Sequence, residues 1–425
     1  MKPALLHSRN LHSKRRHVMM TALLAATLAG GFSPVASGAA AADPWPGWLG
    51  PNRDGHSPDT GLLKQWPDAG PKLLWKVDNL GAGWSSVAVA NDRIYITGNS
   101  AEQQMLLCFD LNGRPVWKVV QGPKCSHQNY PGARSTPTVD GDRICVTGGE
   151  GLVTCHKAST GEILWKREMV SEMGGKVGGW RYAESVLILD QMAIVTPGGK
   201  NAIVALDKTT GQTVWKADVS GTAGYSSCIV LRGQGSTLVV NGSGNGLIAV
   251  DAKTGRRVWT HNFAAGNMAN VPTPAYADGY LVWGVGYGKG AICFKASQTG
   301  NTWNFTEAWT TKDLNCHPGN YVVAQGCVYG KGKGGLVCVE LKTGKTLWAM
   351  REAPAGQASW ADGRLYTAND TDTAGLVEAS AAGGKLVGKF QVASTGRTWA
   401  YPVVAGGRLY VRYHSNLYCY EAKAQ

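Results

Sequence analysis

Residues 205–215 read ALDKTTGQTVW, and the same phrase returns along the chain, each time ending in tryptophan. Close copies occupy residues 155–165 (CHKASTGEILW), 249–259 (AVDAKTGRRVW) and 338–348 (CVELKTGKTLW). A copy that is one residue shorter runs from Cys108 to Trp117, and another begins at Cys293 and reaches Trp309 only after an insertion. Spaced self-similarity of this kind is the sequence signature of a repeat architecture.

Each repeat has the pattern of four short β-strands. The first strand follows a pair of small polar residues such as Ser135-Thr136, and the second follows a turn such as Asp140-Gly141-Asp142. The third ends at the acidic residue of the phrase, and the Thr-Gly pair makes the next hairpin because glycine accepts a positive φ. Four antiparallel strands in roughly 45 residues predict a β-propeller blade, whereas no segment shows the i, i+3, i+4 periodicity of helical repeats.

Eight such blades are predicted. Their first strands start at Val87, Pro137, Val186, Cys228, Pro274, Tyr321, Ala358 and Pro402. The blade-packing tryptophan of the fourth strand is present in six of them, at Trp117, Trp165, Trp215, Trp259, Trp309 and Trp348. The seventh blade is degenerate, with Phe390 near the tryptophan place, and the eighth ends at Glu421 without a fourth strand.

The missing strand of the eighth blade lies upstream of the first blade, at residues 72–76 (KLLWK). Pairing it into the last blade would close the ring and remove the open sheet edges. We therefore expect an all-β protein: a single eight-bladed β-propeller of four-stranded antiparallel blades over residues 72–425, with the last blade closed by an N-terminal strand.

Two segments precede this ring. Residues 1–42 combine a basic stretch, an apolar run from Val18 to Phe32 and small residues with A-x-A sites, which predicts a signal peptide and a periplasmic or secreted protein that does not span the membrane. The Sec route is favoured, although Arg15-Arg16 leaves the twin-arginine route open, and a lipoprotein is excluded because no cysteine lies near the cleavage site. Residues 43–71 contain Trp45, Trp48 and Trp66 with many Pro and Gly, so we expect this segment to pack on the ring.

The net charge and the positions of the cysteines limit the classes of partner and of disulfide that this protein could have. Residues 1–42 hold five of the 42 Lys and Arg and none of the 29 acids, so the remaining chain carries 37 − 29 = +8. These basic residues are scattered and form no run, which argues against a nucleic-acid partner.

Most of the ten cysteines occupy repeat-equivalent strand positions and should behave as small buried hydrophobes. Cys125 and Cys316 lie in loops and could pair only if those loops meet.

The mouth of the channel is the candidate binding site. Three residues before the first-strand positions stand Trp84, Arg134, Ala183, Tyr225, Val271, Pro318, Ala355 and Trp399. Trp84, Arg134, Tyr225 and Trp399 form a candidate ring of ligand-binding residues, which would suit a flat polar ligand. The alternatives are that the aromatic rings only plug the channel, and that Arg134 pairs with Glu184 between blades. One residue before the same positions, a row of mostly Ser and Thr from Ser86 to Tyr401 is expected to close strand hydrogen bonds.

Candidate catalytic and metal-binding residues are few. Glu184 is the candidate catalytic residue and, with Asp370 and Asp372, a candidate calcium ligand. Residues 369–372 (NDTD) resemble the start of a calcium loop but lack its Gly and distal Glu, so a plain turn is favoured. Serine-hydrolase, zinc-protease and phosphate-loop signatures are absent from the sequence.

The A-x-D-x-x-T-G-x-x-x-W phrase resembles the repeat of pyrroloquinoline-quinone (PQQ)-like β-propellers. That family includes quinoprotein alcohol dehydrogenases and the propeller subunit of the outer-membrane barrel-assembly machine. Residues 45–55 (WPGWLGPNRDG), 131–137 (PGARSTP) and 182–185 (YAES) are similar to a secreted bacterial subgroup, some of whose members are named polyvinyl-alcohol dehydrogenases. The resemblance implies PQQ and calcium as cofactors, with Trp84 or Trp399 stacking on the quinone, Arg134 pairing with a carboxylate and Glu184 near the calcium.

The chain lacks the adjacent cysteine pair that methanol-type quinoproteins carry beside the quinone. We therefore expect a non-catalytic binding or scaffold module of the cell envelope, monomeric, with an envelope protein or a small polar ligand as partner. The alternative is a PQQ- and calcium-dependent alcohol dehydrogenase acting on polyvinyl-alcohol-like substrates. A second alternative is carbohydrate or polymer binding at the channel mouth.

Overall fold

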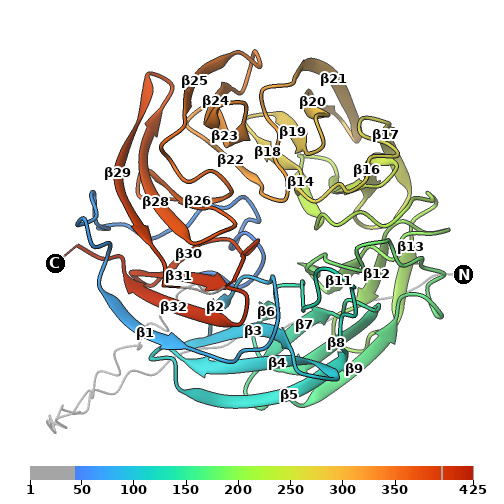
Figure 1. Cartoon of the computed structure of the whole chain (residues 1–425). Helices are drawn as coiled ribbons and strands as arrows, with labels where there is room; N and C mark the ends of the chain where they lie inside the picture. Colours follow the sequence, from blue (N-terminus) through green and yellow to red (C-terminus); the bar gives the residue numbers. More distant parts are fainter. Residues whose placement is uncertain (1–43, 394–395, 425) are drawn as a thin grey trace, which may run out of the picture. The chain divides into compact units, whose positions relative to one another are not determined.

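The computed structural model describes residues 44–393 and 396–424, which form eight four-stranded antiparallel sheets and no helix (Figure 1). The predicted signal peptide lies outside these residues. The first four blades are β2 (Ala88–Ala90), β3 (Arg93–Asn99), β4 (Gln103–Asp110) and β5 (Pro115–Pro123); β6 (Thr138–Asp140), β7 (Arg143–Thr147), β8 (Leu152–Lys157) and β9 (Ile163–Glu168); β10 (Leu187–Leu189), β11 (Met192–Val195), β12 (Val204–Asp207) and β13 (Thr213–Lys216); β14 (Ile229–Arg232), β15 (Thr237–Ser243), β16 (Gly246–Asp251) and β17 (Arg257–His261).

The remaining blades are β18 (Ala275–Ala277), β19 (Tyr280–Val285), β20 (Gly290–Thr299) and β21 (Thr302–Thr311); β22 (Tyr321–Ala324), β23 (Cys327–Gly332), β24 (Gly335–Glu340) and β25 (Thr346–Met350); β26 (Gln357–Ala361), β27 (Arg364–Ala368), β28 (Thr373–Ser380) and β29 (Gly383–Gln391); β30 (Val403–Ala405), β31 (Arg408–Tyr413) and β32 (Asn416–Glu421), completed by β1 (Leu73–Val77). Every first strand begins within one residue of its predicted position. The predicted fold, an eight-bladed β-propeller, is confirmed.

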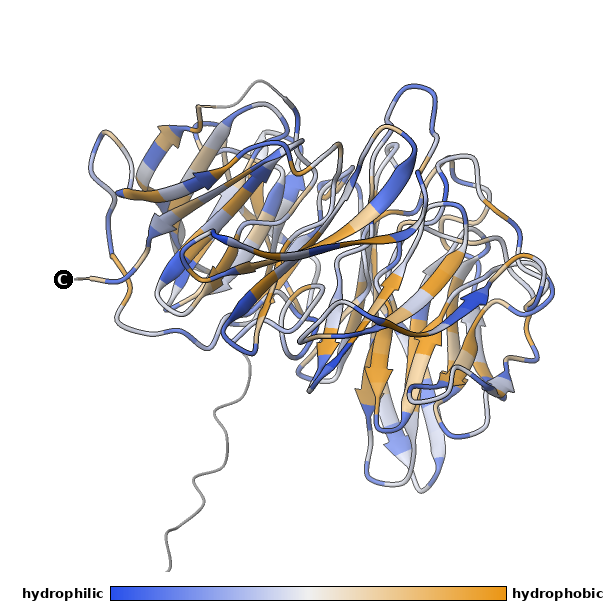
Figure 2. Ribbon diagram, turned by 90° about the horizontal axis from the view of Figure 1, so that it is seen from below, coloured by the Kyte–Doolittle hydropathy of each residue, from blue (hydrophilic) through white to orange (hydrophobic). Residues whose placement is uncertain are grey.

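Ring closure also follows the prediction. Strand β1 pairs antiparallel with β32, with Trp75 opposite Cys419 and Val77 opposite Leu417. Apolar residues are concentrated within the strands, and hydrophilic residues gather at the turns (Figure 2). Within residues 44–393 and 396–424, no helix has the length and apolar character needed to cross a bilayer.

The repeated phrase joins each blade to the next one. Trp165 of the second blade donates its indole N–H to the carbonyl of Lys208 in the third blade, at 3.0 Å. Its ring lies on Gly211, whose φ is 74° and where an added Cβ would come within 2.8 Å of the ring. Only glycine satisfies both the positive φ and the close approach. The same contacts join Trp75 to Leu111 and Gly113, Trp117 to Ala158 and Gly161, Trp215 to Ala252 and Gly255, Trp309 to Leu341 and Gly344, and Trp348 to Ser380 and Gly384.

Two blades depart from this pattern. Trp259 instead stacks on Phe305 of the next blade, with ring centroids 4.4 Å apart, because the β20–β21 hairpin is extended. In the seventh blade the place that tryptophan occupies in other blades belongs to Gly388, two residues before Phe390. Trp66 from the N-terminal segment fills the space: its backbone N–H donates to Val387 O, and an added Cβ on Gly388 would lie 2.5 Å from its side chain.

Residues 44–57 lie against the innermost strands, which face the central channel. Trp45 exchanges backbone hydrogen bonds with Val89 of the first blade, and Pro46 accepts one from Val139 of the second. Further along, backbone bonds link residues 55–57 to Trp360 of the seventh blade. Between these bonds, Trp48 donates to Thr273 at the start of the fifth blade, which lies opposite the first blade in a ring of eight. The segment therefore crosses the channel; Figure 1 shows part of it in blue near the central opening. We call residues 44–57 the channel segment.

The contact between the tryptophan of one blade and the turn of the next blade predicts that this turn requires glycine. Gly211→Ala should lower the free energy of unfolding by about 2–4 kcal/mol, since it adds an overpacking cost to the backbone cost of a positive φ. Gly363→Ala is the matched control, because Gly363 has a similar φ of 79° but nothing within 4 Å of an added Cβ. It should cost only about 1 kcal/mol. Chemical denaturation monitored by tryptophan fluorescence measures the free energy of unfolding of both variants. Equal decreases in the two variants would contradict the proposed role of the tryptophan–glycine contact.

Candidate functional site

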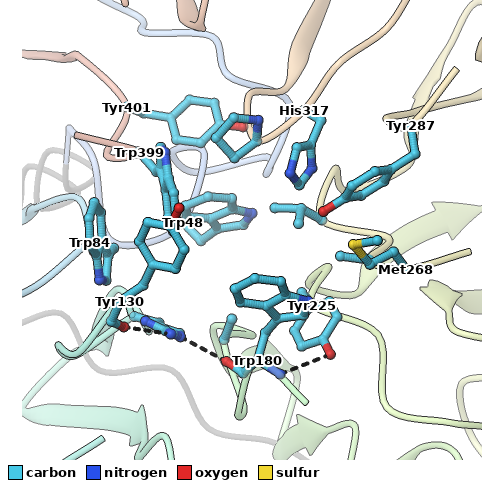
Figure 3. A pocket seen from close by; sticks show the side chains of 15 residues that line it. Trp48, Trp84, Tyr130, Trp180, Tyr225, Met268, Tyr287, His317, Trp399 and Tyr401 are labelled. Carbon is cyan, nitrogen blue, oxygen red and sulfur yellow. Dashed lines mark hydrogen bonds between the residues drawn. The ribbon is translucent and has the colours of Figure 1, made fainter. Parts of the chain in front are cut away.

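A cavity of about 270 Å³ opens where the chain enters the first strands of the blades. The structure brings together seven of the eight residues that the repeat alignment placed at the mouth, and only Ala355 does not line the cavity. These seven are Trp84, Arg134, Ala183, Tyr225, Val271, Pro318 and Trp399. All four candidate binding residues, Trp84, Arg134, Tyr225 and Trp399, therefore line one cavity. Figure 3 shows three of them, Trp84, Tyr225 and Trp399, around the same space.

Several lining residues were missed by the sequence reasoning. Most lie in loops or in the channel segment, outside the repeated phrase, so no periodic signal marks them. They are Trp48, Tyr130, Trp180, Met268, Ala269, Tyr287 and His317. Tyr401 was assigned to the layer beneath the mouth, yet its ring also reaches the cavity. The outcome is a cavity with aromatic rings on every side (Figure 3).

The aromatic walls are packed against one another rather than free to collapse. Trp84 and Trp399 stack with ring centroids 4.2 Å apart and an interplanar angle of 24°. Trp180 stacks in the same way on His127, at 4.7 Å and 16°. Tyr130 lies between these pairs, 5.0 Å from Trp399. A wall already held by its own contacts needs little ordering when a ligand enters.

The floor of the cavity is Trp48, from the channel segment. Its indole N–H donates to the hydroxyl of Thr273 at 3.1 Å, and its ring meets Tyr401 edge-on with centroids 4.7 Å apart. The channel segment therefore supplies the part of the lining that lies deepest in the cavity.

The predicted Ser and Thr row lies directly beneath the cavity. Each backbone N–H donates to the hydroxyl of the next blade, at 2.7 to 3.2 Å. The series runs from Tyr401 to Ser86, Thr136, Ser185, Ser227 and Thr273. The expectation that this row closes strand hydrogen bonds is confirmed, and the row holds six neighbouring blades in register under the aromatic residues.

Arg134 is the only cation that lines the cavity. Its Nε donates to Trp180 O at 3.0 Å, one terminal nitrogen to Gly132 O at 3.3 Å and the other to Tyr130 O at 2.8 Å. Burial lowers the pKa of this guanidinium, and Arg134 forms no ion pair with any described residue. The side chain thus fixes the two loops that carry Tyr130 and Trp180, and it leaves a positive charge at the wall.

Glu184 lies below the cavity and does not line it. Its carboxylate accepts hydrogen bonds from the backbone N–H of Thr196, at 2.7 Å, and from the hydroxyl of the same residue. Burial raises its pKa to about 7. The nearest cation is Arg53 of the channel segment, which donates to the carbonyls of Ser185 and Val186 at 2.8 and 2.9 Å. The alternative of an Arg134–Glu184 ion pair was therefore wrong, because Arg134 is bound to carbonyls and Glu184 to Thr196.

The candidate metal ligands are not brought together. Asp370 and Asp372 lie in the turn between β27 and β28, where the side chain of Asn369 accepts three backbone N–H groups. Asp372 instead accepts a hydrogen bond from Gln391 at 2.7 Å. In the part of the chain that the structure describes, no group of three His, Cys, Asp or Glu residues is placed to hold a metal ion. Cys125 and Cys316 are both buried and unpaired, like the other eight cysteines.

A family model described as outer membrane protein assembly factor BamB matches residues 102–350 and 332–423. A polyvinylalcohol dehydrogenase from a Pseudomonas species is 32% identical over 97 residues, which are 23% of this chain and only 15% of that enzyme's length.

Two solved structures resemble the fold. BamB from Moraxella catarrhalis has a TM-score of 0.60 at 16% identity, covering 84% of this chain and 99% of that one. The quinohemoprotein alcohol dehydrogenase from Comamonas testosteroni has a TM-score of 0.62 at 12% identity, covering 90% of this chain and 81% of that one. At these identities the likeness concerns the fold.

The buried carboxyl predicts a pH dependence. The pKa of Glu184 in the folded protein, about 7, lies above its ordinary value of 4.5, so the folded state holds its proton more tightly. Below pH 4.5 the group is neutral in both states; as the pH rises from 4.5 through 7, ionisation favours the unfolded chain. Stability should therefore fall across this window, and Glu184→Gln, which keeps the shape and stays neutral, should remove that part of the fall.

The effect should be on the order of 1–3 kcal/mol at pH 8, where the Gln variant is the more stable protein. Urea denaturation of both proteins at pH 4.5, 6 and 8 measures it. Parallel stability curves for the two proteins would show that Glu184 titrates normally.

Proposed function

Because the chain belongs to the PQQ-like propeller family of the outer membrane protein assembly factor BamB, we propose that it is an exported, non-catalytic binding propeller of the cell envelope. Its ligand would occupy the aromatic cavity. The observation that carries this proposal is an aromatic cavity with prepacked walls and a floor supplied by the channel segment. The export signal predicted from the sequence of residues 1–42 and the outer-membrane role in the name of the family favour the compartment.

The residues of the cavity do not fit PQQ with calcium. A tricarboxylate would need several free cationic donors, but each nitrogen of Arg134 already donates to a carbonyl. Calcium would need oxygen ligands, and no Asp, Glu, Asn or Gln lines the cavity. Glu184, the candidate catalytic residue, is engaged with Thr196 beneath the floor. We therefore favour binding over the quinoprotein dehydrogenase alternative.

Calorimetric titration of residues 43–425 with PQQ in the presence of calcium tests this choice. We expect no heat of binding at micromolar concentrations and no alcohol-dependent reduction of an artificial electron acceptor. Tight binding that Arg134→Ala abolishes, together with such reduction, would restore the dehydrogenase.

A second candidate function, a protein scaffold, is favoured by the outer edge of four consecutive blades. Apolar side chains that are 37–52% exposed lie on the fourth strands β1, β5, β9 and β13, at Leu73, Leu74, Val116, Val120, Ile163, Leu164 and Val214. The fourth strands of the other four blades expose no large apolar side chain among the described residues. On the apolar edges the tryptophan is followed by a lysine, at Lys76, Lys118, Lys166 and Lys216.

Lysines on edge strands oppose pairing between two copies of the same edge, which agrees with the expected monomer. They attract an extended segment that alternates acidic and apolar residues, so the partner we propose for this edge is an acidic strand of an envelope protein. A capped eight-residue peptide of alternating Glu and Val is the probe.

Fluorescence anisotropy should show this peptide binding to the protein, and Lys118→Glu with Lys166→Glu should weaken binding at least tenfold. Lys385→Glu with Lys389→Glu, which makes the same change of charge at exposed positions of β29, a fourth strand without the apolar edge, is the matched control and should change binding little. Equal weakening by both pairs would mean that only net charge attracts the peptide.

A further inference from the structure

We infer that the aromatic cavity takes a neutral polyhydroxylated ring, such as a sugar unit, in preference to an organic cation or a planar anion. This inference rests on the proposed binding function of the cavity. It concerns the chemical class of the ligand, which the charges, hydrogen-bond partners and size of the lining residues decide.

A cationic ligand is disfavoured by the charge of the wall. Rings of aromatic side chains attract quaternary ammonium groups when no like charge lies near. Here the positively charged Arg134 lies in the wall itself, and no carboxylate lines the cavity to offset it. A second cation would therefore meet a like charge in a poorly solvated space.

An anionic ligand is disfavoured by the hydrogen bonds of the same residue. A carboxylate binds arginine best through a pair of parallel N–H donors. Three of the five N–H donors of Arg134 are committed to the carbonyls of Tyr130, Gly132 and Trp180, and Nε has no second proton, so the donor pair that includes Nε is not free. An anion that paired through Nε would break the bond to the carbonyl of Trp180, and otherwise only one N–H on each terminal nitrogen remains for it.

The remaining polar groups of the cavity are neutral. The hydroxyls of Tyr130, Tyr287 and Tyr401 make no hydrogen bond to any described residue, and a phenol both donates and accepts. Burial lowers the pKa of His317, so this imidazole is neutral at pH 7 and also offers a donor and an acceptor. Hydroxyl groups on a ligand match such partners without any charge.

The apolar part of the lining matches the faces of a sugar ring. An aromatic face is electron-rich and packs well against C–H groups that carry a small positive charge. Trp180, Trp399 and Trp48 come from three different segments and supply such faces on two walls and the floor. A volume of about 270 Å³ lies near the lower end of small-molecule sites, which fits one ring.

The rim of the cavity allows that ring to belong to a longer chain. Met268 is 65% exposed and Tyr287 39% exposed, so an apolar lip leads from the cavity to solvent. Tyr287 has a φ of 57°, unusual for a bulky residue, and this backbone conformation places its ring 4.3 Å from that of His317. The inner ring of an oligosaccharide would be enclosed, and its next units would lie on this lip.

Quenching of tryptophan fluorescence tests the ligand class with three probes: cellotriose as the neutral saccharide, benzoate as the planar anion and choline as the cation. We expect saturable quenching by cellotriose at micromolar to millimolar concentrations, and at least tenfold weaker responses to benzoate and choline. Trp180→Ala should weaken saccharide binding at least tenfold, whereas Trp180→Phe, which keeps an aromatic face, should recover most of it. Thermal unfolding of both variants confirms that they are folded.

The outcomes separate the two proposals. Saturable binding of benzoate or choline but not of the saccharide would overturn the inferred ligand class and leave the binding function standing. Binding that is equally strong in wild type and Trp180→Ala would place the ligand outside the cavity. If none of the three probes binds, both the ligand class and the cavity as a binding site are contradicted.

Discussion

Six of the eight blades are held to the next by an indole ring that lies on a glycine, and the rest of the structure depends on this contact. The tryptophan of one blade reaches the turn of the following blade, where its N–H meets a carbonyl and its face meets a glycine that has no Cβ. Removing such a buried ring typically costs about 3–5 kcal/mol. Because the contact is repeated around most of the ring, it fixes the angle between blades and hence the positions of the loops that converge at the mouth.

Blade angle alone does not make a binding site, since a ring of eight blades leaves a channel. The channel segment fills that space by pairing with the inner strands, and it carries Trp48 to the cavity floor and Arg53 to the carbonyls beside Glu184. Trp66, a little further along, supplies the ring that the seventh blade lacks. The N-terminal segment thus completes the packing that the repeats leave unfinished, at the channel and at the weakest blade.

The repeated phrase made the fold and much of the mouth predictable. Its period set the blade count, the closing role of β1 and the start of each first strand, and aligning the copies located Trp84, Arg134, Tyr225 and Trp399. Trp48, Tyr130 and Trp180 could not be found in this way, because they lie in non-repeating segments whose course depends on tertiary contacts. Gly388 was missed for a related reason: it replaces the tryptophan of the phrase, so no repeated residue marks its place.

The family relationship is clear for the fold and leaves the chemistry open. The same blades can support an enzyme or a binding surface, since function is decided by the residues at the mouth. In this chain those residues are aromatic and neutral apart from one arginine whose nitrogens are bound to carbonyls. That lining, with a floor supplied by the channel segment, is the basis for proposing a binding propeller.

Hydrogen–deuterium exchange of residues 43–425 measures whether the channel segment is held inside the ring. The backbone N–H groups of Trp45 and Ser57 donate to the inner strands, at Val89 and Trp360. They should therefore exchange as slowly as the N–H groups of β2 and β26. Exchange of residues 45–57 within seconds, as in a free N-terminal tail, would contradict this placement of the channel segment and remove the floor from the proposed binding site.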